Sequence, residues 1–135
     1  MATNLAYPNL EAMSLPVPSG TVSGEPVIAG TTPTSGTTIA VDGINGVALT
    51  DRSAGDPTNP SGYATVATRG AFRVSVATNV ATTSALAIGD VVYCNITTFV
   101  LSSSVTNGAP WGRALEAKAD NEAASTILVA IIPSI

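Results

Sequence analysis

The chain has 135 residues, enough for one domain with a real hydrophobic core but short for two ordinary ones. Hydrophobic residues make up 45% of it, yet aromatic residues are only 4% and charged residues only 10%, against about 25% charged in a typical domain. Because Ala and Val supply most of the apolar surface, the composition favours many short strands over a helical bundle.

Charge and residue usage exclude several classes of function. The net charge at pH 7 is −4, so no basic surface is available for nucleic acid. The absence of histidine excludes His-based catalytic triads and His-ligated metal sites. The longest apolar run, 127–132, is far below the roughly 20 residues that span a bilayer. The first residues show no secretory signal, so we expect neither membrane nor nucleic acid as a partner.

The beginning of the chain carries little strand character. We interpret residues 1–12 as an extended arm ahead of a single β domain at residues 13–135. Apolar residues in such an arm have no core of their own to join. We therefore expect contacts with another chain at Asn4, Leu5, Tyr7 and Leu10.

Alternation of apolar and polar residues between turn signals predicts about nine or ten short strands, typical of an all-β barrel or sandwich. In chain order the strand-like segments are Met13–Val17, Glu25–Ala29, Ile39–Val41, Ile44–Thr50, Tyr63–Thr68, Ala71–Ala77, Val91–Asn95, Thr98–Leu101, Trp111–Ala117 and Ser125–Ile132. A proline in the first segment indicates an edge strand, and the strongly apolar last segment is expected to close the structure.

The connections between these segments differ in character. Residues 51–62 form the longest polar loop and should be exposed. Only Arg69-Gly70 separates Tyr63–Thr68 from Ala71–Ala77, which favours a hairpin. Residues 78–88 are ambiguous, and Thr83–Ile88 fits one helical turn.

An internal echo indicates two similar β units. Gly24 precedes an acidic residue and a strand-like segment, and Gly46 begins the sequence Gly-Val-Ala-Leu 22 residues later. Gly89 and Gly112 do the same, with Gly-Arg-Ala-Leu 23 residues after Gly89. Two copies are too few for a solenoid, so we expect a barrel built from two related units.

Candidate chemistry is sparse. No Gly-Lys-Ser/Thr phosphate loop exists, since the only lysine, Lys118, lies between two alanines. Asp51 and Asp56 share a loop but supply too few oxygens for a calcium ion. The charged run Glu116, Lys118, Asp120 and Glu122 is interpreted mainly as a solvated surface. A free cysteine such as Cys94 is usually a small buried apolar residue. Taken together, these observations lead us to expect no enzyme activity, no metal and no other cofactor.

Trp111 is the largest anchor in this aromatic-poor chain. Tryptophan is favoured at binding hot spots, and it is also needed for the core here. Both roles stay open at this point: a core residue, or a contact residue at an interface with another chain.

Several segments resemble the small capsid cement, or head decoration, proteins of tailed bacteriophages. They are Leu15–Thr21, Ser23–Val27, Gly46–Asp51, Ala87–Tyr93 and Gly112–Lys118, within a resemblance that runs over roughly residues 13–132. The stretch 30–38 and the loop 51–62 are longer than the family pattern. The family offers no catalytic residues to carry over.

This resemblance implies a structural virion protein, made in the host cytoplasm, that binds the outer surface of a phage capsid through the major capsid protein and stabilises the shell. It also implies a homotrimer, so that the chain contacted by Asn4, Leu5, Tyr7, Leu10 or Trp111 is a capsid protein or a neighbouring subunit. The competing hypothesis is a carbohydrate-binding or adhesive β module of a phage tail or fibre, which needs exposed aromatic side chains to stack on sugars. The chain has only one Trp and three Tyr to offer.

Overall fold

The computed structural model describes residues 12–30, 43–57, 60–78, 85–96, 98–119 and 124–133. Within them the chain forms nine strands and no helix, so the expected all-β class is confirmed. The strands are β1 Ala12–Pro16, β2 Pro26–Ala29, β3 Ile44–Ala48, β4 Tyr63–Ala67, β5 Ala71–Ala77, β6 Val91–Asn95, β7 Leu101–Ser102, β8 Gly108–Ala114 and β9 Ser125–Ile131.

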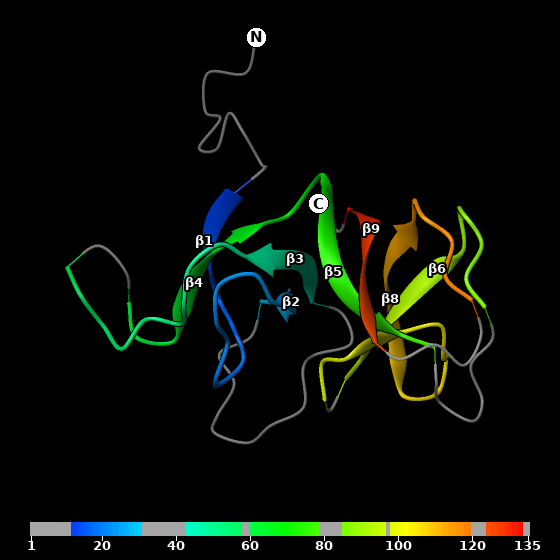
Figure 1. Cartoon of the computed structure of the whole chain (residues 1–135). Coiled ribbons are helices and arrows are strands. Elements are labelled where there is room, and N and C mark those ends of the chain that lie inside the picture. Colours follow the sequence, from blue (N-terminus) through cyan, green and yellow to red (C-terminus); the bar gives the residue numbers. More distant parts are fainter. Residues whose placement is uncertain are drawn as a thin grey trace, which may run out of the picture.

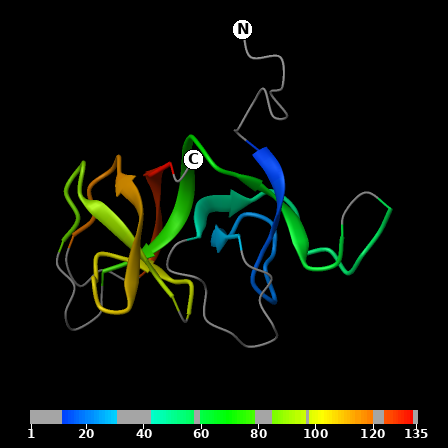
Figure 2. The same cartoon turned by 180° about the vertical axis from the view of Figure 1, so that it is seen from behind.

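The strands divide into two groups that lie side by side (Figure 1). The first half of the chain forms a four-stranded sheet in the order β1-β4-β3-β2, and the second half forms a closed barrel in the order β5-β7-β6-β8-β9. Figure 2 shows the same division from behind. Neither a single barrel nor a simple sandwich describes this arrangement, although β1 is an edge strand and β9 closes the barrel by pairing with both β5 and β8, as expected.

The predicted hairpin between β4 and β5 is wrong. β4 pairs with β1 and β3, whereas β5 pairs with β7 and β9, so the two strands belong to different groups. Gly70 has a positive φ of 108° at the crossing, and its carbonyl accepts the Ile131 N–H at 2.9 Å. Alternation along a strand shows which face is buried, not which strand is its neighbour.

The two groups repeat one pattern of strand pairing. β1, β4, β3 and β2 are neighbours in the sheet in the same order as β5, β9, β8 and β6 in the barrel. Ala67 and Ala130 are therefore equivalent, since each pairs with the first residue of its group's first strand. The matching pairs are Ala12–Ala67 with Ala71–Ala130, Val47–Ala67 with Arg113–Ala130, and Val27–Gly46 with Val92–Gly112.

Hydrogen bonds at the turns before β2 and β6 extend the repeat. The Gly24 N–H donates to the Ala48 carbonyl, and the Gly89 N–H donates to the Ala114 carbonyl, both at 2.7 Å. The two turn glycines also share a left-handed backbone, with φ of 92° and 95°, which suits residues without a Cβ. The echo read from the sequence thus corresponds to a repeated structural unit.

The connection from β6 to β8 distinguishes the second unit from the first. It contains β7, whose residues Leu101 and Ser102 pair with β6 and run parallel to the end of β5, which completes the barrel. The expected strand Thr98–Leu101 is shorter than predicted because Phe99 lies in a tight turn. Its N–H donates to the Asn95 carbonyl at 2.8 Å, and its φ is 62°.

The ambiguous stretch before β6 forms no helical turn over residues 85–88. Leu86 makes an isolated antiparallel bridge with Lys118, with N–H to carbonyl distances of 2.8 and 2.9 Å in the two directions. Residues 81–84, like the expected strand 39–41, lie outside the described residues. The loop 51–62 is largely exposed where it is described, as expected.

Two apolar cores support the two groups. A small core lies within the first sheet, and a larger one fills the barrel. β2 and β3 contribute to both because successive side chains of a strand point to opposite faces. Val27 and Ala48 face the small core, whereas Ile28 and Val47 pack into the larger core with barrel residues. The first sheet is therefore packed against the barrel.

Candidate functional site

The contact between the two halves is built on Trp111, the only tryptophan. Its side chain is fully buried, and its indole Nε1 donates to the Val27 carbonyl of the first half at 3.1 Å. The structure therefore places this side chain in the core, one of the two roles that the sequence left open. No part of its surface is exposed for a partner in the described chain.

Asn45 completes this contact from the opposite side. Its Nδ2 donates to the carbonyls of Pro110 and Ile132, each at 3.1 Å, and the residue is only 7% exposed. Two buried polar side chains, one from each half, thus bond to the backbone of the other half. Such bonds hold the halves in one relative position because a buried polar group left without a partner costs free energy.

The four arm residues proposed as contacts, Asn4, Leu5, Tyr7 and Leu10, lie outside the described residues. Their assignment stays a prediction. The described chain begins at Ala12, the first residue of the edge strand β1. The proposed arm is therefore directly continuous with an edge of the first sheet.

The charged run that was interpreted as a solvated surface is only partly so. Lys118 is 4% exposed, and its Nζ donates to the Ser125 hydroxyl at 2.6 Å, which corrects the expectation for this residue. Its long side chain reaches back from the strand end to a hydroxyl at the start of β9. Glu116 follows the expectation more closely, since it forms a surface ion pair with Arg73 at 2.9 Å. Asp120 and Glu122 lie outside the described residues.

A cleft of about 380 Å³ opens between the two halves, bordered by residues 19–21, 25 and 26 of the first half and by Ser75 and residues 98–101 of the second. Glu25 is the only ionisable side chain among the described residues that line it. Its carboxylate already accepts the Val22 N–H at 3.1 Å. The cleft therefore brings together no acid–base pair for proton transfer.

Other candidate reactive groups are also accounted for within the described chain. Burial raises the pKa of the Cys94 thiol from 9.0 to about 12, which keeps it protonated and unreactive near neutral pH. The Asp51 carboxylate accepts the Ser23 N–H at 2.9 Å. The described residues contain no group of three or more side chains of metal-ligand type and no helix long and apolar enough to cross a membrane.

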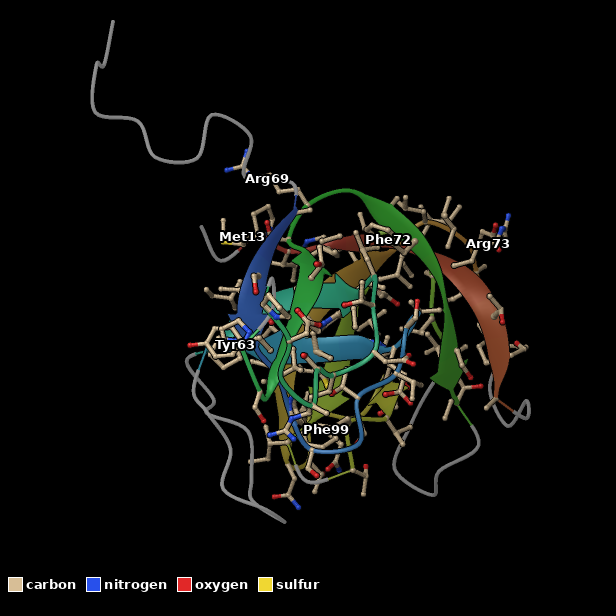
Figure 3. All side chains as sticks on the ribbon, turned by 90° about the vertical axis from the view of Figure 1, so that its left-hand side faces the viewer. Met13, Tyr63, Arg69, Phe72, Arg73 and Phe99 are labelled. Atoms are coloured by element: carbon tan, nitrogen blue, oxygen red, sulfur yellow. The ribbon has the colours of Figure 1, made fainter. Side chains whose placement is uncertain are left out.

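The exposed surface of the described chain carries aliphatic rather than aromatic side chains. Figure 3 labels Met13 and Tyr63 on the first sheet and Phe99 below them, in the turn between β6 and β7, and all three are at least partly buried. None of the aromatic side chains in the described part of the chain is exposed. The large apolar residues that are exposed there are Val22, Leu49, Ile88, Val100, Val105 and Leu115.

These features define an all-β protein of two related units that exposes aliphatic side chains in several of its turns. A model of the phage cement protein family matches residues 16–131, a range that contains β2 to β9 in full and only Pro16 of β1. The chain therefore belongs to the phage cement protein family, which makes it a protein associated with a phage capsid and located in the virion. No curated protein and no solved structure matches the chain.

Proposed function

We propose that the protein binds the outer surface of a phage capsid, contacts the major capsid protein and stabilises the shell without catalysing a reaction. The observation that carries this proposal is the family match across both halves, so the proposed role belongs to the whole domain. The shared core and the hydrogen bonds of Trp111 and Asn45 support this proposal, because a protein that stabilises a shell must itself resist deformation.

The active unit in this proposal is a homotrimer. One contact of a small protein with a capsid subunit is weak, but three linked copies engage several subunits at once and gain avidity. The proposal needs no cofactor. It also gives the arm a role: because it continues from the edge strand β1, it can add to a sheet edge on a neighbouring subunit through main-chain hydrogen bonds.

The deciding experiment is co-sedimentation of the purified protein with expanded phage heads that lack it. We expect saturable binding at a fixed number of copies per major capsid subunit, and treated heads that withstand more heat or chelator before releasing DNA. Analytical ultracentrifugation of the free protein measures the trimer separately. A folded protein that does not bind heads but is retained on a glycan array would support the tail or fibre alternative instead.

A truncation tests the arm. The expected boundary lay after residue 12, but β1 begins at Ala12, so removing residues 1–11 leaves that strand whole. The truncated protein should fold and unfold as the full chain does, and bind heads more weakly. A substitution set with Asn4, Leu5, Tyr7 and Leu10 changed to Ser keeps the length of the arm and separates loss of side-chain contacts from loss of backbone.

A further inference from the structure

The two related units each carry an exposed aliphatic corner. We define the first corner as residues 22–25 with Leu49, and the second corner as residues 87–90 with Leu115. These corners hold four of the six large apolar side chains that are exposed in the described chain. The exposed fractions are 48% for Val22, 45% for Leu49, 70% for Ile88 and 39% for Leu115.

The leucines of the two corners occupy equivalent positions. Leu49 follows β3 and its N–H donates to the Thr65 carbonyl of β4 at 2.7 Å. Leu115 follows β8 and its N–H donates to the Leu128 carbonyl of β9 at 2.9 Å. The turn before the equivalent glycine also exposes one aliphatic side chain in each unit. Val22 lies two residues before Gly24, and Ile88 lies one residue before Gly89.

Both turns are held in place by a carboxylate. In the first corner the Glu25 Oε2 accepts the Val22 N–H at 3.1 Å, and in the second the Asp90 Oδ2 accepts the Ala87 N–H at 2.8 Å. The hydrogen bonds from the Gly24 N–H to the Ala48 carbonyl and from the Gly89 N–H to the Ala114 carbonyl hold each turn against the neighbouring strand. The apolar side chains therefore stand on preorganised backbone, so a partner that covers them orders little additional chain.

The corners belong to different halves of the molecule, the first at the end of β3 in the sheet and the second at the end of β8 in the barrel. The two strands point in different directions, and their C-terminal ends lie apart (Figures 1 and 2). The molecule therefore offers the same kind of apolar contact at two separate places. Two copies of the same partner, side by side, suit this arrangement.

We propose that the two corners are the points at which one molecule bridges two adjacent copies of the same capsid subunit, with each aliphatic pair seated in an apolar recess of one copy. The inference rests on the proposed capsid function and adds its contact residues. A shell repeats one subunit, so it presents the same recess at regular intervals. A duplicated unit presents the same corner twice, which matches that repetition.

The test uses the full chain and heads that lack the protein. One variant changes the first corner (V22S and L49S), one changes the second (I88S and L115S), and one combines them. The matched control is V100S and V105S, because these valines are 50% and 66% exposed but lie outside both corners. Circular dichroism and Trp111 fluorescence verify that each variant is folded.

We expect each single-corner variant to bind heads roughly tenfold or more weakly than the unchanged protein, the combined variant to lose saturable binding, and the control to bind normally. Folded corner variants that bind as well as the unchanged protein would overturn the bridging role while leaving the proposed function intact. An unchanged protein that does not bind heads would overturn both. Corner variants that lose self-association in free solution would assign the corners to contacts between copies of this chain, which also contradicts the proposal.

Discussion

Gly46 and Gly112 occupy the same crowded position in the two halves of the molecule. A Cβ on Gly112 would meet the Val129 Cγ1 at 2.6 Å and the Ala130 carbonyl oxygen at 2.7 Å. A Cβ on Gly46 would meet the corresponding atoms of β4, the Val66 Cγ1 and the Ala67 carbonyl oxygen. The backbones of β3 and β4 in the first unit, and of β8 and β9 in the second, therefore approach so closely that only glycine fits.

The glycine pair gives a matched prediction. G46A and G112A should each lower the free energy of unfolding by about 1–3 kcal/mol, because the added methyl group forces a neighbouring strand to move. Urea denaturation followed by circular dichroism measures this. The control is A71S at an exposed strand position, which should change stability by less than about 0.5 kcal/mol. An unaffected G112A would show that the barrel adjusts freely at this point.

The contact between the halves predicts a strong effect of two single substitutions. W111F removes the indole donor from the Val27 carbonyl and leaves a small void, and N45A removes both amide bonds to the second half. Each should cost about 1–4 kcal/mol of unfolding free energy. Calorimetry is the suitable readout because W111F removes the fluorophore. If N45A melts in two separate transitions, the amide is what couples the halves into one cooperative unit.

Cys94 predicts a defined pH dependence. Its thiol has a pKa of about 12 in the folded state and 9.0 ordinarily, so both states are protonated below pH 9. Between pH 9 and about 12 the unfolded thiol loses its proton while the folded thiol keeps it, so stability falls as pH rises.

The matching experiment compares the protein with C94A across that range. Their difference in unfolding free energy should decrease by about 1.4 kcal/mol per pH unit above pH 9, since C94A lacks the titrating group. At pH 8 the folded protein should react with a thiol reagent only as fast as it unfolds. Rapid labelling of folded protein would contradict the burial of this side chain.

Lys118 and Arg52 are a second equivalent pair. The Lys118 N–H donates to the Leu86 carbonyl, as the Arg52 N–H donates to the Thr21 carbonyl, both at 2.9 Å. K118A should cost about 1–3 kcal/mol because it removes a buried stem and a charge-assisted hydrogen bond to Ser125.

R52A should cost less, since that side chain is half-buried and its Nε bond to the Val17 carbonyl is longer, at 3.2 Å. R73A is the exposed control and should cost under about 1 kcal/mol, because its ion pair with Glu116 is in solvent. Thermal melts at low and high salt measure all three. Equal losses for K118A and R73A would contradict the difference in burial.

Local sequence patterns predicted the bounds of the strands better than they predicted which strands pair with each other. The bounds of Ala71–Ala77 and Val91–Asn95 match β5 and β6, because alternation and turn residues are local signals. The hairpin between β4 and β5 was wrong because pairing depends on segments far apart in the chain, such as β5 and β9. The Gly-x-Ala-Leu echo in the sequence corresponds to the repeated unit, because the same turn and strand start recur in both halves.

The candidate site was less accessible from the sequence. Leu49 and Leu115 were part of the echo, yet alternation alone does not show that a leucine just after a strand is exposed. Lys118 was interpreted as a surface charge because its burial depends on Ser125 and on the bridge to Leu86. The arm residues Asn4, Leu5, Tyr7 and Leu10 stay a prediction for the binding experiments.

The residue before the crowded glycine differs between the halves: Asn45 in one and Trp111 in the other. Two separate identical chains would have to place the same side chain on both sides of their interface. Joining the copies in one polypeptide removes that constraint, so a bulky ring on one side can face a compact amide on the other. Within this one chain the contact between the two related units is therefore asymmetric, with an indole donor from one unit and an amide donor from the other.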